Sequence, residues 1–307
     1  MDYKQLHPKF WAGWILISLA WCITRLPIAC QFWLGKQLGK LSYRAGGRRL
    51  DITRTNIALC FPERSVAEQD RLVREIFIST GISATETALA WFRPAGFYCK
   101  RMEITGLELL QAAQKGGKGV LLVGAHFATL DIAGALLGSV SKLDVIYRKN
   151  KNPQIDQLMY KGRKRIYQML LERKNTRQIL RRLKQGATIW YAADQDYGKK
   201  HSVFVPFFGI EAASITATTR LAKFNDSAVL FFSHYRNPAD QTWFLDISAI
   251  ENYPGGDLAM DARKINSIIE REIRKHPEQY LWLHRRFKSR PEGESGLYGD
   301  ASRSRSR

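Results

Sequence analysis

Short apolar runs that alternate with helix-like segments are the feature that most constrains the fold of this chain. Residues 120–124 (VLLVG) are wholly apolar and follow the glycine-rich turn at 116–119, a pattern typical of a buried strand. Further strands are predicted at 143–147, 188–192, 228–235 and 242–247, and helices at 128–138, 154–171, 214–224 and 259–275. Strands and helices in alternation predict an α/β fold, with a mixed central sheet and helices on both faces.

The N-terminal part is apolar and almost uncharged. Residues 10–35 hold 26 residues with a single charge, Arg25, and four tryptophans, which favour membrane interfaces. Basic residues follow in excess from Lys36 onward, and by the positive-inside tendency this bias places the main domain in the cytoplasm. We therefore expect an N-terminal hydrophobic membrane helix. A cleaved signal peptide and a buried core helix are the alternatives, and whether the segment spans the bilayer or lies in its interface is open.

Residues 41–100 are predicted to be mostly helical. Pro62 and Pro94 punctuate this stretch, and Ser65 stands three residues before Glu68, a spacing that favours a helix N-cap.

The charge of the chain predicts an anionic partner. With 48 Lys and Arg against 28 Asp and Glu among 307 residues, the net charge is +20. Residues 142–184 alone hold fourteen basic and three acidic residues, which is an excess of +11. Beside an apolar segment, this favours a surface for phosphorylated lipid over a nucleic-acid site, because aromatic side chains do not interleave with the basic ones.

The sequence lacks the motifs of several common classes of metal site and enzyme. The four cysteines fit neither a metal site nor a disulfide scaffold. The chain has no G-x-S-x-G elbow, P-loop or G-x-G-x-x-G motif. We therefore predict no metal and no cofactor, and an activity other than that of a serine hydrolase, a nucleotide-dependent kinase or a dinucleotide enzyme.

His126 is the strongest catalytic candidate. It follows the strand predicted at 120–124, and ligand sites of α/β sheets lie at the carboxyl ends of strands. An imidazole ordinarily titrates near neutrality, so it can take a proton from an alcohol. Asp131 follows after four residues, and we expect its carboxylate to orient the ring. The spacing H-x4-D is common, so a structural histidine is the alternative.

Longer motifs make the chain resemble a known family. Together with the stretch from Gly124 to Asp131, they run through most of the sequence: NIALCFP at 56–62, WYAADQDYG at 190–198, SVFVPFFG at 202–209 and PEQYLWLHRRFK at 277–288. The chain resembles the Gram-negative lipid A biosynthesis late acyltransferases, which are lauroyl and myristoyl transferases within the H-x4-D/E acyltransferases. The family often carries Glu where this chain has Asp131.

The resemblance implies a glycerolipid acyltransferase-like fold and an enzyme of the cell inner membrane whose catalytic domain faces the cytoplasm. Such an enzyme moves a fatty acyl chain of the laurate or myristate class from acyl carrier protein to a hydroxyl of the Kdo-linked, tetra-acylated lipid A precursor. The family's catalytic pair falls on His126 and Asp131, and two further family positions fall on Arg163 and Asp194. Arg148, Arg163, Lys164 and Arg165 are candidates to hold the acceptor's phosphates or sugar acids, and Arg163 alternatively pairs with an acid. Asp194 is assigned to the substrate-binding set, with a structural role as its alternative.

Three segments follow from these observations: a membrane anchor at 1–40, a catalytic acyltransferase domain at 41–290, and a basic tail at 291–307, predicted to be disordered. Two other functions remain open. One is a glycerophosphate or lysophospholipid acyltransferase, which shares the chemistry but not the motif at 277–288. The other is a non-enzymatic basic protein that binds membranes or nucleic acid.

Overall fold

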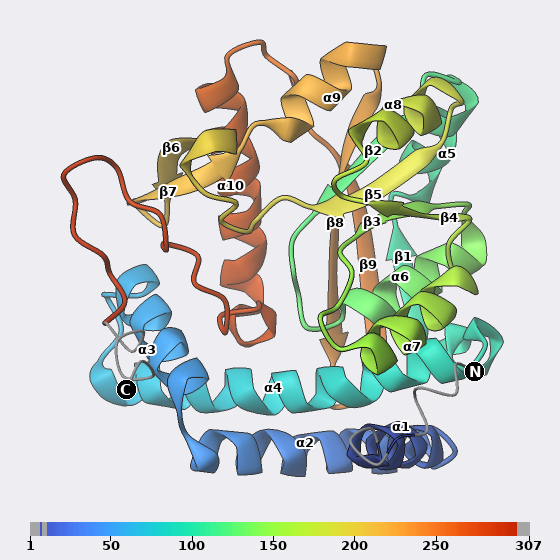
Figure 1. Ribbon diagram of the computed structural model, residues 1–307, viewed down its shortest axis with the longest axis vertical. Coiled ribbons are helices and arrows are strands. Elements are labelled where there is room, and N and C mark those ends of the chain that lie inside the picture. Colours follow the sequence, from blue (N-terminus) through green and yellow to red (C-terminus); the bar gives the residue numbers. More distant parts are fainter. Residues whose placement is uncertain (1–6, 8–10, 300–307) are drawn as a thin grey trace.

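A seven-stranded sheet forms the centre of the computed structural model, which describes residues 7 and 11–299 (Figure 1). The order across the sheet is β1-β9-β8-β2-β5-β3-β4. Its strands are β1 (Met102–Thr105), β2 (Val120–Gly124), β3 (Asp144–Tyr147), β4 (Met169–Glu172), β5 (Thr188–Ala192), β8 (Ala228–Asn237) and β9 (Thr242–Ala249). Strands β8 and β9 pair antiparallel and the other neighbours pair parallel, so the predicted mixed sheet is confirmed.

Helices cover both faces of the sheet. The helices after α2 are α3 (Arg48–Cys60), α4 (Val66–Phe92), α5 (Leu107–Lys115), α6 (Leu130–Val140), α7 (Pro153–Lys164), α8 (Thr176–Lys184), α9 (Ala217–Asn225) and α10 (Leu258–Lys275), of which α3 packs against α4. Successive strand residues point to opposite faces. Leu121 and Val123 therefore join one core cluster with α8 and α10, whereas Val120 and Leu122 join a second cluster with α4 and α6.

Four strands have no counterpart in the sequence prediction. β1 and β4 lie at the two edges of the sheet, and β6 (Ser202–Phe207) and β7 (Ile210–Ile215) form a separate antiparallel hairpin. The helix predicted at 154–171 ends at Lys164, and its last residues form β4 instead. Apolar residues at helical spacing continue into that strand, so periodicity alone did not show the boundary. The predicted N-cap is confirmed, since Ser65 and Glu68 form a complete capping box.

The N-terminal apolar segment is two helices rather than one. Helix α1 (Trp11–Ile23) ends before Arg25, and α2 (Ile28–Ala45) begins after Pro27. Thirteen residues of α-helix extend about 20 Å, whereas the hydrocarbon core of a bilayer is about 30 Å thick. Helix α2 is longer but carries Lys36 and Lys40. No helix in the described part of the chain is long and apolar enough to cross a membrane, so the predicted membrane helix is not supported.

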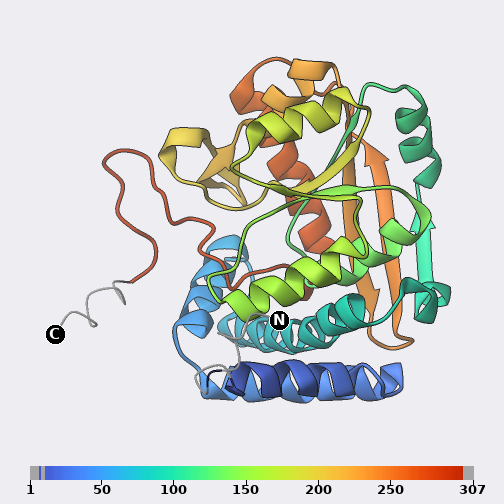
Figure 2. The same ribbon diagram turned by 45° about the vertical axis from the view of Figure 1, so that its right-hand side comes forward.

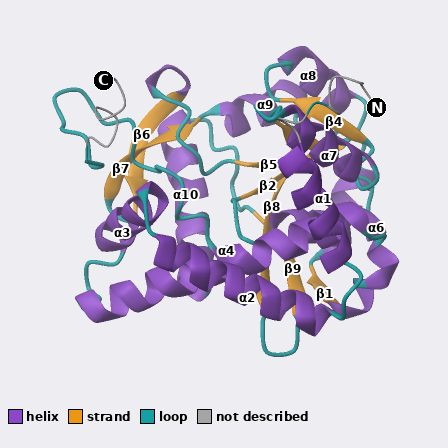
Figure 3. Cartoon of the chain, turned by 60° about the horizontal axis from the view of Figure 1, so that its bottom comes forward, coloured by secondary structure: helices purple, strands orange, loops and turns teal. Residues whose placement is uncertain are grey.

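Helix α2 packs lengthwise along α4 (Figures 1 and 2), and its Phe32 ring also contacts Trp243 of β9, with ring centres 6.1 Å apart. Small residues permit the close approach of the two helices: a Cβ atom on Gly81 would lie 2.2 Å from the carbonyl oxygen of Gly35, and one on Gly39 would lie 2.4 Å from that of Phe77. Helix α1 has no buried residue. Seen from below, α1 and α2 lie on the outside of α4 (Figure 3).

The C-terminal segment differs from its prediction. Residues 291–299 lack regular structure, but Leu297 and Tyr298 pack against the first core cluster. The Tyr298 hydroxyl also donates a hydrogen bond to Asn56 on α3. The expected disorder is therefore wrong for 291–299, while 300–307 lie outside the described residues.

Candidate active site

His126 and Asp194 come together because two neighbouring strands deliver them to the same edge of the sheet. Strands β2 and β5 pair in parallel, and the register places Gly124 opposite Ala192. His126 and Asp194 each follow two residues later, so they occupy equivalent places beyond the carboxyl ends of adjacent strands. The predicted position of His126, after a strand and before a helix, is confirmed.

The two side chains form a tight pair. The Nδ1 atom of His126 lies 2.6 Å from Oδ1 of Asp194, and the backbone N–H of His126 donates to Oδ2 at 3.1 Å. The Asp194 side chain is 2% exposed and that of His126 is 25% exposed. Burial alone would raise the pKa of the Asp194 carboxyl, but the charge and hydrogen bonds of His126 outweigh it and lower the pKa to about 2. A carboxylate on Nδ1 leaves Nε2 to exchange a proton with a substrate.

The prediction that Asp131 orients His126 is wrong. Asp131 lies in the first turn of α6, and its Oδ1 accepts hydrogen bonds from Nε of Arg163 at 2.9 Å and from Nε1 of Trp91 at 3.1 Å. The helix directs this carboxylate toward α4 and α7, away from the ring. Arg163 is therefore paired with an acid, which was the alternative to its predicted contact with the acceptor's phosphates or sugar acids. Asp194, which was assigned to substrate binding, instead holds the histidine.

A cavity of about 240 Å³ opens beside His126. Its walls are formed by the carboxyl ends of β3, β4 and β5 and by side chains of α6 and α7; they include His126, Tyr147, Arg148, Arg163, Arg173 and Trp190. Only some of the basic residues predicted to bind the acceptor line this cavity. Arg148 and Arg163 line the cavity, whereas Lys164 and Arg165 are exposed and do not, and Arg165 donates to the carbonyl of Trp91 at 3.1 Å.

Arg173 is a site residue that the sequence prediction missed. It follows β4 directly and lines the cavity together with Arg148. Its guanidinium lies 5.3 Å from the ring centre of Tyr197, another wall residue. Among the described residues neither Arg148 nor Arg173 has a carboxylate within ion-pair distance. The signal for Arg173 was its position after a strand, but that strand had been assigned to a helix.

A second histidine lies behind the first. His234 on β8 is buried, and its Nδ1 lies 2.8 Å from the Thr129 hydroxyl, which donates in turn to the His234 carbonyl. Burial, followed by the charge of His126, lowers the pKa of His234 to about 3. His234 is therefore neutral at physiological pH.

Comparison with known proteins gives this arrangement its context. Residues 1–289 match the model of the bacterial lipid A biosynthesis acyltransferases. The chain belongs to this family. The lipid A biosynthesis lauroyltransferase of Escherichia coli is 39% identical over 295 residues, which cover 95% of this chain and 96% of that protein. The palmitoleoyltransferase of the same organism is 38% identical with the same coverage, and its myristoyltransferase is 27% identical over 300 residues, or 97% and 93%.

Membership makes this chain a lipid A biosynthesis acyltransferase, and the predicted family is confirmed. The relatives differ in the acyl group that their names give: lauroyl, palmitoleoyl or myristoyl. The shared property is therefore acyl transfer in lipid A biosynthesis, and the acyl group varies within the family.

Proposed function

We propose that this acyltransferase moves a fatty acyl chain of the laurate or myristate class from acyl carrier protein to a hydroxyl of the Kdo-linked, tetra-acylated lipid A precursor. The observation that carries the proposal is the His126–Asp194 pair at the wall of a basic cavity. A general base serves a reaction in which an alcohol attacks an activated acyl group, and a thioester supplies that group without a cofactor.

In the proposed reaction, Nε2 of His126 takes the proton of the acceptor hydroxyl as its oxygen attacks the thioester carbonyl carbon. The Asp194 carboxylate keeps Nδ1 protonated and stabilises the imidazolium that forms. The tetrahedral intermediate then collapses, the carbon–sulfur bond breaks, and the imidazolium returns the proton to the leaving thiolate. The products are the ester and the free thiol of the carrier.

Arg163 supports the negative charge that develops on the thioester oxygen. Arg163 lines the cavity, and its side chain is 14% exposed. The Asp131 carboxylate accepts from its Nε, so the two terminal nitrogens of the guanidinium can donate to the substrate. Donors of this kind contribute roughly 3 kcal/mol each to transition-state stabilisation. Arg148 and Arg173 lack carboxylate partners in the described part of the chain and bind the anionic groups of the acceptor.

The acceptor is a lipid, and the N-terminal helices offer a surface for the membrane that contains it. Their large apolar side chains exposed by 46% or more are Trp11, Ile15, Leu16, Leu19 and Trp21 on α1 and Trp33, Leu38 and Leu41 on α2. We call these residues the N-terminal apolar surface. Basic residues, including Arg25 and Lys36, accompany them. We propose that this surface lies in the interface of the inner membrane, on the cytoplasmic side.

Acyl transfer by the purified protein tests the proposed function. Acyl carrier proteins loaded with chains of 12, 14 and 16 carbons are the donors, and the Kdo-linked precursor and a lysophospholipid are the competing acceptors. Mass spectrometry of the products is expected to show one added acyl chain on the precursor, and none with His126→Ala. Acylation of the lysophospholipid alone would instead support the glycerolipid alternative.

A further inference from the structure

The loop that carries His126 pairs with a segment that follows α10. The backbone N–H of Leu281 donates to the carbonyl of His126 at 2.9 Å. The backbone N–H of Ala128 donates to the carbonyl of Gln279 at 2.6 Å, and the two bonds flank an antiparallel bridge. The backbone of the general base is therefore held by residues 279–281, more than 150 positions later in the chain.

The Asp194 carboxylate makes the place of the His126 ring depend on the place of the His126 backbone. One of its oxygens accepts from the backbone N–H of His126 at 3.1 Å, and the other lies 2.6 Å from Nδ1 of the ring. Both contacts hold together only while the His126 backbone keeps its position beside the end of β5. A shift of the His126 loop therefore lengthens the contact between the ring and the carboxylate.

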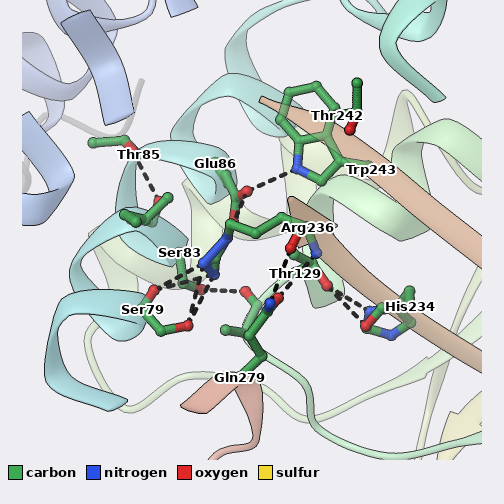
Figure 4. A network of polar contacts seen from close by, with 12 residues as sticks. Ser79, Ser83, Thr85, Glu86, Thr129, His234, Arg236, Thr242, Trp243 and Gln279 are labelled. Carbon is green, nitrogen blue, oxygen red and sulfur yellow. Dashed lines mark hydrogen bonds and ion pairs between the residues drawn. The ribbon is translucent and has the colours of Figure 1, made fainter. Parts of the chain in front are cut away.

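The Gln279 side chain fastens the supporting segment to the edge of β8 (Figure 4). The pairing of β2 with β8 ends at Gly124 and Phe232. Beyond that point the Gln279 amide accepts from the backbone N–H of Arg236 at 2.9 Å and donates to the Arg236 carbonyl at 3.0 Å. Gln279 thus offers this strand one acceptor and one donor, as the backbone of a further strand would.

Arg236 is a fixed partner for Gln279 because a buried polar network holds its side chain (Figure 4). The Arg236 guanidinium donates to Glu86 at 3.1 Å and to the carbonyl of Ser79 at 3.1 Å, both on α4. Glu86 also accepts from Nε1 of Trp243 at 2.7 Å. All five side chains are buried, and a buried network with these bonds made rigidifies its surroundings.

We propose that Gln279 is a positioning residue for acyl transfer: its side-chain amide fixes the segment that holds the His126 backbone and thereby keeps the ring on the Asp194 carboxylate. The inference rests on the proposed role of His126 as general base. Other residues form the walls of the cavity beside His126, so Gln279 acts through the backbone and not on the substrate.

The test compares Gln279→Met with Asn266→Leu. Both variants replace a buried amide by an apolar side chain of similar size, but Asn266 on α10 donates to the Pro206 carbonyl at 3.0 Å and to Oγ of Ser214 at 2.9 Å. In Gln279→Met we expect kcat to fall about tenfold, the effect of weakening one hydrogen bond to a charged group, at unchanged KM for both substrates. In Asn266→Leu we expect wild-type kcat and KM.

The pH profile separates positioning from stability. The Asp194 carboxylate favours the protonated imidazole, and this effect weakens as the ring moves away from it. The acidic limb of kcat/KM is therefore expected to move to lower pH by about half a pH unit in Gln279→Met and to stay in place in Asn266→Leu. Asp194, His234 and His284 interact electrostatically with His126, and neither variant replaces them.

An NMR titration of the His126 ring makes the same comparison without any substrate. A lower midpoint in Gln279→Met alone supports the inference even if the proposed acceptor proves wrong. An unmoved midpoint overturns it, as does an equal move in both variants. Loss of thermal stability in Gln279→Met with an unmoved midpoint also overturns it, because Gln279 would then only stabilise the fold.

Gln279→Asn carries the test if Gln279→Met does not fold. Asn keeps the amide, but its side chain is one methylene shorter, so it meets Arg236 only by drawing residue 279 and the paired Ala128 toward β8. The midpoint of the His126 titration is again expected to fall, and an unmoved midpoint in this folded variant would overturn the inference.

Discussion

Replacing Asp194 by Asn tests the catalytic pair most directly. The substitution keeps the shape of the side chain but removes the charge that lies 2.6 Å from Nδ1 of His126. The charge and hydrogen bonds of His126 lower the pKa of this carboxyl to about 2 against the effect of burial, and a hydrogen bond to a charged group contributes about 2 kcal/mol. Losing about 2 kcal/mol from the transition state slows a reaction roughly 30-fold.

The tautomer of His126 adds to this loss. An Asn amide can donate to Nδ1, which would place the ring proton on Nε2, where it cannot accept the proton of the acceptor. We therefore expect kcat of Asp194→Asn to fall by about 100-fold or more, with little change in KM for either substrate.

The assay is steady-state acyl transfer with acyl carrier protein as donor, and Asp131→Asn is the matched comparison. Asp131 contacts Arg163 and Trp91 instead of the ring, so its loss changes the arginine. The acidic limb of the pH profile is expected to move in Asp194→Asn and to stay in place in Asp131→Asn. A well-folded Asp194→Asn enzyme with wild-type kcat would refute the assignment.

Three further predictions follow from the cavity, the buried histidine and the N-terminal helices. Arg173→Ala is expected to raise KM for the lipid acceptor about tenfold at unchanged kcat, since it removes a charged contact to an anionic group; an equal rise with a dephosphorylated acceptor would contradict a phosphate contact. His234 has a folded-state pKa of about 3, below its unfolded value of 6.5, so the unfolded chain binds more protons and the free energy of unfolding falls as pH drops through this window. Denaturant unfolding of His234→Asn should show a shallower fall, by up to about 1.4 kcal/mol per pH unit. The double variant Ile15→Asp/Leu19→Asp should lose flotation with anionic vesicles, whereas Met260→Asp, on α10, should keep it.

The sequence predicted the middle of the central sheet because two of its inner strands are short and almost wholly apolar. Strands at 120–124 and 188–192 are buried on both faces. Such a continuous apolar run can be recognised as a strand from its own sequence, without knowledge of the strands beside it. The edge strand β4 was missed because its residues continue the apolar stripe of the helix before it. The break between α1 and α2 was underestimated, although Arg25 and Pro27 were visible in the sequence.

The sequence predicted one member of the catalytic pair and missed its partner. The place of His126 followed from the strand before it, but its partner depended on strand order, which sequence spacing does not reveal. The nearest acid along the chain, Asp131, lies on a helix that turns it toward Arg163. Asp194 is 68 residues away and reaches the ring because β5 is the neighbour of β2.

The contact between Asp131 and Arg163 bears on the variation that the family resemblance implies at this position. A carboxylate that held the imidazole would have to keep one length, because the backbone of His126 is itself held in place, its carbonyl accepting from the N–H of Leu281 at 2.9 Å. A carboxylate that meets a guanidinium faces a partner with several rotatable bonds. A change of arginine rotamer can accommodate one added methylene there. Glu can therefore replace Asp at position 131 without disturbing the contact between Asp194 and His126.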